Sequence, residues 1–255
     1  MQRAITREIS PAMARCELTH RAREPIDVDL ARRQHAAYEQ CLKDAGYLVT
    51  RLAADGEIPD SVFVEDIAVV FEELAFITRP GAMSRRAETA AVADVLRPIR
   101  LLHSIDPPGT IDGGDVLTVR RHVFIGESGR TNAEAIAQMR KTLTPLGYTV
   151  IPVAVRECLH LKSAVTALDG DTLLINREWA PFDPFRSFRL IDVDPAEPPA
   201  ANALRLADRV VYPVAFPRTR ARLEGHGIRV IDVDVSEIAK AEGAVTCCSL
   251  IMDET

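Results

Sequence analysis

A polar motif followed by two short apolar segments and a helical pattern recurs along this chain of 255 residues. Two clear copies are FVEDIAVVFEELAFITRPGAMSRRAETAAVADVL and TIDGGDVLTVRRHVFIGESGRTNAEAIAQMRKTL. The copies are spaced roughly 45 residues apart, a period typical of chains that repeat one supersecondary unit. The leading polar residues of the five copies are Asp66, Asp112, His160, Asn202 and Cys247.

Five units of this kind predict an α/β fold in which each unit has the order ββαβ and the units form a five-unit propeller. The fifth copy starts at VTCCSLIM and reaches the end of the sequence before a second strand, so we expect the N-terminal AITREI to supply it. Strands from both termini would then close the ring and remove free sheet edges. Because the connection DPAEPPAAN is short, we expect a single catalytic domain over residues 1–255.

Local signals define the helices within the units. The clearest helix follows Arg130, where Thr131 and Glu134 predict a capping box and Gly147 ends the apolar periodicity. Another helix is expected to stop before Pro98. The third copy has only a short helical segment after its predicted hairpin turn.

Composition excludes several classes of function. The formal net charge of −6 disfavours a nucleic-acid binder and is compatible with a small cationic substrate. No apolar run has the length of a membrane-spanning helix. The start MQRAITREIS lacks an apolar signal segment, and the five cysteines show no CxxC spacing, so we expect a cytoplasmic protein.

Equivalent positions of a ring of units meet near its axis, which would bring Asp66, Asp112, His160 and Cys247 together. A thiol, an imidazole and carboxylates are the components of a site with a nucleophile, a base and an orienting group. Taken alone, each residue has an ordinary structural interpretation; a single cysteine, for instance, usually packs as a small apolar residue. Their shared place in the repeat favours a catalytic interpretation.

The segments FVED, PGTIDGGDVL, IGESGRTNAEA, LHLK and TCCS resemble the dimethylarginine dimethylaminohydrolase family of the guanidine-modifying, or pentein, superfamily. The resemblance runs from about Leu18 to the C-terminus. It implies the pentein fold and hydrolysis of Nω-methylated arginines to citrulline and dimethylamine or methylamine through a covalent cysteine thiouronium intermediate. It also implies a small cationic amino-acid substrate, no cofactor and no metal. Because bacterial members of the family form homodimers, it implies a homodimer for this chain as well.

The resemblance also assigns catalytic residues. Cys247 matches the family's nucleophile, His160 its catalytic histidine and Asp112 the carboxylate that orients the histidine, where some bacterial members have glutamate. In a strand the side chains of Cys247 and Cys248 would point to opposite faces, so only one can face the axis. We expect Cys247 to do so and Cys248 to pack in the core.

The resemblance further assigns residues that bind the substrate. Glu65 and Asp66 match the acidic pair that faces the guanidinium. Asp60 and the backbone carbonyl of Leu18 match the site for the α-amino group. Arg85 and Arg130 match the clamp on the α-carboxylate. Relatives commonly have an aliphatic residue followed by aspartate where this chain has Ala241 and Glu242, so we expect the pocket wall to differ there.

Three alternatives remain open on the residues alone. The same site would serve an arginine deiminase or another guanidine hydrolase. A catalytically silent protein could retain the fold to capture an arginine-like ligand. Redox sensing through Cys247 and Cys248 would require a vicinal disulfide and therefore a distorted peptide.

Overall fold

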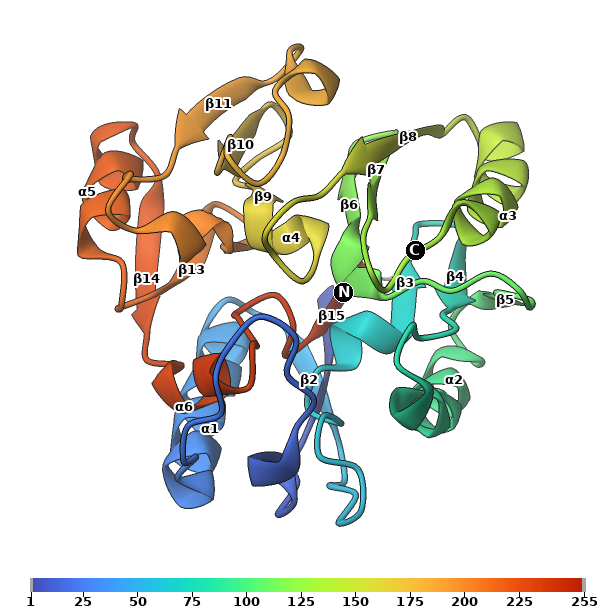
Figure 1. Ribbon diagram of the computed structural model, residues 1–255, viewed down its shortest axis with the longest axis horizontal. Helices are drawn as coiled ribbons and strands as arrows, with labels where there is room; N and C mark the ends of the chain where they lie inside the picture. The colour runs from blue at the N-terminus through green and yellow to red at the C-terminus, as the bar shows by residue number, and fades with distance from the viewer. Residues whose placement is uncertain (1, 254–255) are drawn as a thin grey trace.

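The computed structural model describes residues 2–253, and within that range it contains five sheets of three strands each (Figure 1). In every sheet an antiparallel pair is extended by a third strand that runs parallel to the middle one. The strands are β1 (Gln2–Arg7), β2 (Leu48–Leu52), β3 (Ala68–Val70), β4 (Leu74–Ile77), β5 (Leu101–Ser104), β6 (Val116–Val119), β7 (His122–Glu127), β8 (Thr149–Ala154), β9 (Val165–Ala167), β10 (Thr172–Ile175), β11 (Arg189–Asp192), β12 (Leu204–Leu206), β13 (Arg209–Pro213), β14 (Arg229–Val233) and β15 (Leu250–Asp253).

In four of the five units that the structure describes, a helix connects the middle strand of the sheet to its parallel third strand, so the unit has the predicted order ββαβ. The connecting helices are α1 (Val28–Asp44), α2 (Thr89–Leu96), α3 (Ala133–Leu143) and α5 (Pro217–Gly225). Two shorter helices lie between units: α4 (Leu161–Ala164) precedes β9, and α6 (Ser236–Lys240) follows β14. In the third unit, between β10 and β11, a 3-10 turn at Asp183–Phe185 takes the place of the helix, in agreement with the short segment predicted there. No helix in the described part of the chain has the length and hydropathy needed to cross a bilayer.

The two ends of the chain meet in one sheet. Strand β1 pairs with β15 in antiparallel register, with Ala4 opposite Ile251 and Ile5 opposite Leu250. The same strand pairs with β2 on its other side. The prediction that AITREI completes the fifth copy is therefore confirmed.

Apolar packing joins each unit to the next. Within the described residues the buried apolar side chains form five clusters, and each cluster combines side chains from consecutive units. One cluster packs Phe76 of the first unit against Met139 of the second, and another packs Leu250 of the last unit against Val64 of the first. A single unit would expose these faces, so burial between units stabilises the whole set.

The leading polar residues lie in short helical turns that precede the first strand of each sheet. Asp66 belongs to the 3-10 turn Val64–Ile67, and His160 immediately precedes α4. Cys247 also lies in a turn, in which its N–H donates to the carbonyl of Ala244 at 3.2 Å. The prediction of a strand at Cys247 and Cys248 is wrong, because β15 begins only at Leu250.

The capping box predicted at Thr131 and Glu134 is also wrong. The N-cap of α3 is Asn132, whose side chain accepts the N–H of Ala135 at 3.1 Å. The hydroxyl of Thr131 donates instead to Asp115 at 2.6 Å. A buried acceptor from another segment therefore outcompetes the local cap for this hydroxyl.

Candidate active site

His160 lies between two carboxylates. Its Nε2 is 3.1 Å from Oδ2 of Asp112, and its Nδ1 is 3.8 Å from Oδ1 of Asp66. Asp112 is fully buried, and its Oδ1 accepts the N–H of Gly81 at 2.9 Å. The hydrogen bond to Asp112 and the ionic contact with Asp66 lie on opposite edges of the ring and define its orientation.

Gly114 allows the close approach of Asp66 to the imidazole. Its N–H donates to Oδ1 of Asp66 at 3.1 Å. A Cβ atom at this position would lie 2.6 Å from Nδ1 of His160 and 2.8 Å from Oδ1 of Asp66. Any other residue would force the histidine and the carboxylate apart, which explains a glycine in the TIDGGD segment.

The surroundings of His160 favour its charged form. Burial by itself lowers the pKa of the imidazole, but the charge of Asp66 and the hydrogen bond to Asp112 outweigh it and raise the pKa to about 9. Burial would raise the pKa of Asp66, yet the charges of His160 and Arg85 lower it. At neutral pH the site therefore holds an imidazolium beside ionised Asp66.

Cys247 is half-buried at the same site. Burial, together with the negative charges of Glu65 and Asp66, raises the pKa of its thiol well above the usual value. Its neighbour Cys248 is fully buried in an apolar cluster, as predicted, and burial raises its thiol pKa as well. In the absence of a bound cation, Cys247 is a neutral thiol.

Glu65 lies next to Cys247 but faces away from it. Its N–H donates to the carbonyl of Cys247 at 3.2 Å, while its carboxylate accepts Nζ of Lys162 at 2.6 Å and the hydroxyl of Thr246 at 2.8 Å. Glu65, Lys162 and Thr246 line a separate cavity of about 490 Å³. Both carboxylate oxygens of Glu65 already have protein partners.

A small cavity collects most of the predicted site residues. Six of them line it, and these are Asp60, Asp66, Arg85, Arg130, His160 and Cys247. Its volume of about 20 Å³ leaves room for roughly one water molecule. Asp112 lies behind His160, whereas Glu65, Leu18 and Ala241 do not line this cavity.

The two predicted clamp arginines differ in their surroundings. Arg85 is buried and donates to Asp66 at 2.6 Å, to both oxygens of Glu88 at 3.0 and 2.8 Å, and to the carbonyl of Phe63 at 3.0 Å. Arg130 is more open: its Nη2 donates to Thr19 Oγ1 at 3.1 Å, and its Nη1 lies 3.5 Å from Asp112. More of the hydrogen-bonding capacity of Arg130 is free for a ligand.

Three ligand atoms of Asp66, Asp112 and His160 lie within 4.8 Å of one another, close enough to hold a metal ion. The positive charges of Arg85 and protonated His160 already compensate these carboxylates. A cation would have to displace the proton of His160, so the arrangement fits a charged hydrogen-bond network better than a metal site.

Sequence reasoning gave no role to three residues that shape the site: Asp115, Lys162 and Thr246. Asp115 is buried and accepts the hydroxyls of Ser128 and Thr131 and the N–H of Leu161. The one available signal was that Lys162 belongs to the LHLK segment, whereas Glu242 had been expected to alter the pocket wall. Nothing local indicates their partners.

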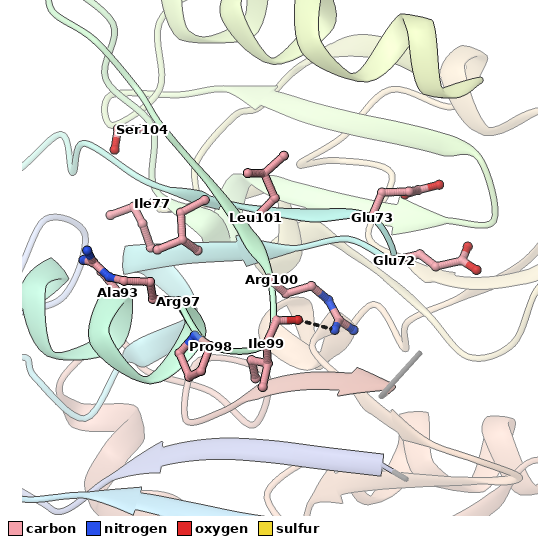
Figure 2. A pocket seen from close by; sticks show the side chains of 11 residues that line it. Glu72, Glu73, Ile77, Ala93, Arg97, Pro98, Ile99, Arg100, Leu101 and Ser104 are labelled. Atoms are coloured by element: carbon pink, nitrogen blue, oxygen red, sulfur yellow. Dashed lines mark hydrogen bonds between the residues drawn. The ribbon is translucent and has the colours of Figure 1, made fainter.

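A further cavity of about 690 Å³ lies away from this site, along β5 and the C-terminal end of α2. Figure 2 shows the side chains that line it, including Leu101 and Arg100, whose guanidinium donates to the carbonyl of Ile99. No histidine or cysteine lines it, so the chemistry expected of a guanidine hydrolase has no nucleophile there.

The chain is similar to known proteins along its length. A family model described as N,N dimethylarginine dimethylhydrolase, eukaryotic, matches residues 14–175. The N(G),N(G)-dimethylarginine dimethylaminohydrolase of Streptomyces coelicolor is 40% identical over 258 residues, which cover 99% of this chain and 98% of the relative. This chain belongs to the dimethylarginine dimethylaminohydrolase family.

Other members of the dimethylarginine dimethylaminohydrolase family show the same likeness. The enzyme of Pseudomonas aeruginosa is 39% identical over 226 residues, covering 88% of this chain and 89% of that protein. The solved structure of a cysteine-to-serine mutant from the same organism, complexed with citrulline, superposes with a TM-score of 0.93. It is 36% identical and covers 98% of each chain, so the α/β fold of this family is shared throughout.

Proposed function

We propose that this protein hydrolyses Nω-methylated arginines, including asymmetric dimethylarginine and monomethylarginine, to citrulline and dimethylamine or methylamine. The observation that carries the proposal is the position of His160 between Asp66 and Asp112, in one cavity with the Cys247 thiol. Family membership directs this chemistry to guanidines. The printed names of the relatives and the citrulline in a relative's structure support the substrate and product.

In the first half of the reaction, the Cys247 thiolate attacks the guanidinium carbon and forms a C–S bond. The bound cation offsets the negative charges that keep the thiol neutral, so the thiol releases its proton to solvent as the substrate binds. His160 then donates its proton to the substituted nitrogen. The C–N bond breaks, the amine leaves, and a thiouronium remains on Cys247.

In the second half, His160 is neutral and acts as a general base. It takes a proton from a water molecule that attacks the thiouronium carbon. The C–S bond then breaks and the remaining hydroxyl proton is lost to solvent, which releases citrulline and restores the thiolate. Asp112 holds the ring throughout and favours its charged form.

The remaining predicted residues are proposed to position the substrate. Asp66 accepts hydrogen bonds from the guanidinium, with Glu65 adding negative charge from behind. Asp60 and the carbonyl of Leu18 bind the α-amino group. Arg130, assisted by Arg85, binds the α-carboxylate. Ala241 is buried immediately before the cavity-lining residues Glu242 and Gly243, and it is proposed to shape the pocket wall from behind them.

Glu242 bears on the choice between methylated and free arginine. A free carboxylate pointing into the pocket would favour arginine, because it would accept the additional N–H groups. In this structure Glu242 lines the cavity, but its carboxylate oxygens are held by three backbone N–H groups of another loop. Free arginine would then bury unpaired donors, at a cost of about 1 to 3 kcal/mol each, and this disfavours a deiminase.

We also propose that residues 1–255 form a single catalytic domain, a five-unit propeller closed by its terminal strands. The pairing of β1 with β15 and the apolar clusters between consecutive units support this arrangement. The unpaired state of its cysteines is consistent with a cytoplasmic location. We further propose that the protein forms a homodimer, as bacterial relatives do.

Citrulline release from arginine, monomethylarginine and asymmetric dimethylarginine, measured under matched conditions, tests the function. We expect kcat/KM for the methylated substrates to exceed that for arginine by roughly ten- to several-hundredfold. A kcat/KM for arginine equal to or above the methylated pair would instead identify a deiminase. No citrulline from any of the three would refute both.

A further inference from the structure

The carboxylate of Glu242 accepts hydrogen bonds from three consecutive backbone N–H groups. The donors are Thr19 at 2.9 Å, His20 at 2.5 Å and Arg21 at 2.6 Å. These residues are more than 200 positions away in the sequence, and they belong to an exposed loop that has no helix or strand. One side chain therefore anchors a whole loop segment.

The backbone around Glu242 is constrained so that its side chain reaches this loop. Glu242 has a φ of +58°, in the left-handed region that residues other than glycine seldom adopt. Ala241 before it is buried, and a Cβ atom on Gly243 after it would lie 2.2 Å from the ring of Phe63. An unfavourable conformation held from both sides is typical of a functional position.

The anchored loop carries the groups proposed to bind the amino-acid end of the substrate. Leu18 immediately precedes the first donor, and the N–H of Glu17 donates to Asp60 at 3.1 Å. The hydroxyl of Thr19 accepts Nη2 of Arg130 at 3.1 Å. The loop thus connects the proposed site for the α-amino group to the proposed site for the α-carboxylate. Glu242 holds this loop through its backbone N–H groups.

We propose that Glu242 is a positioning residue that fixes the 17–21 loop so that the substrate's α-amino and α-carboxylate groups are recognised together. This inference rests on the proposed function. Glu242 lines the small cavity that holds Cys247 and His160, but its carboxylate is bonded to the loop, so we place its action on Leu18 and Arg130. Because its role concerns one end of the substrate, its loss affects amino-acid substrates selectively.

The variant Glu242→Gln keeps the size of the side chain but removes the charge, and its amide offers a single acceptor oxygen for three donors. Glu242→Asp keeps the charge and retracts the carboxylate by one methylene. The matched control is Glu24→Gln, which removes an exposed carboxylate close to the anchored segment. Monomethylarginine is compared with an alkylguanidine that lacks both the α-amino and the α-carboxylate group.

We expect Glu242→Gln to raise KM for monomethylarginine roughly 10- to 100-fold with kcat changed only a few-fold, and Glu242→Asp to recover part of the loss. Turnover of the alkylguanidine should change less than about threefold. Amide hydrogen exchange at residues 19–21 should accelerate in Glu242→Gln and stay at the wild-type rate in Glu24→Gln. An equal loss on both substrates, or unchanged exchange at these amides, would overturn the inference.

Calorimetry of citrulline binding in a Cys247→Ser background tests the effect of Glu242 on affinity without turnover. Adding Glu242→Gln should weaken citrulline binding at least tenfold, and unchanged affinity would also overturn the inference. Failure of the proposed function is distinguishable, because then the parent protein would neither bind citrulline nor release it from methylated arginines.

Discussion

Nζ of Lys162 lies 2.6 Å from Oε1 of Glu65, and the N–H of this glutamate donates to the carbonyl of Cys247. Burial raises the pKa of the Glu65 carboxyl, and the charge of Lys162 opposes that rise. Most of the pair is inaccessible to solvent, with side-chain exposures of 18% for the lysine and 9% for the glutamate. The ion pair thus stabilises a negative charge directly behind the candidate nucleophile.

Lys162→Met should destabilise the protein by about 3 kcal/mol, because it leaves Glu65 buried without its partner. Thermal or denaturant unfolding measures this loss. Lys141→Met, at an exposed position of α3, is the control and should change stability by less than about 0.5 kcal/mol. Equal stability of the two variants would show that the ion pair contributes nothing.

Cys247→Ser should abolish citrulline release, since a serine hydroxyl is a much weaker nucleophile at neutral pH. Cys248→Ala should retain most of the activity, because Cys248 packs in the core. Turnover with monomethylarginine compares the two variants. Loss of activity in the alanine variant alone would reverse the assignment of the nucleophile.

The Cys247 thiol should react slowly with neutral iodoacetamide at pH 7, because burial and the charges of Glu65 and Asp66 raise its pKa. A cationic amidine electrophile brings the charge that stabilises the thiolate and should react faster. Mass spectrometry of the modified peptide gives both rates. Equal rates, after correction for intrinsic reactivity, would contradict ionisation assisted by the bound cation.

His160 should make stability depend on pH. Its pKa is about 9 in the folded protein, above the ordinary value near 6.5, so protonation of His160 stabilises the fold below about pH 6.5. This contribution, on the order of 3 kcal/mol, is lost as pH rises through 9. Unfolding curves between pH 6 and 10 should show the slope in the wild type, and His160→Gln should flatten it. Direct NMR titration of the imidazole near pH 6.5 would exclude the proposed charge state.

Arg130→Ala should lower kcat/KM for methylated arginines by roughly 10- to 150-fold, which corresponds to about 1.5 to 3 kcal/mol for one charge-assisted contact. Turnover of an alkylguanidine without a carboxylate should fall little. Arg85→Ala should instead reduce both, because Arg85 also neutralises buried Asp66 and Glu88. A uniform loss in Arg130→Ala would indicate a structural role for that arginine.

The sequence by itself determined the repeating order of strands and helices. Apolar periodicity and turn residues act over a few neighbours, so the ββαβ unit and the role of AITREI could be derived before the units were placed in space. The recurrence of one polar position per unit also indicated that Asp66, Asp112, His160 and Cys247 would meet. The alternation of side chains expected in a strand did not apply to Cys247 and Cys248, because the chain forms a turn there and the strand begins later.

The tertiary structure alone decided which partner each buried charge has. Glu65 faces Lys162, Arg85 is occupied by Asp66 and Glu88, and Glu242 anchors the loop that carries Thr19. Several of these pairs join residues far apart in the sequence, and their distances depend on how the units pack against one another. The protonation states of His160 and Cys247 depend on the same packing, because a pKa reports burial and neighbouring charge rather than local sequence.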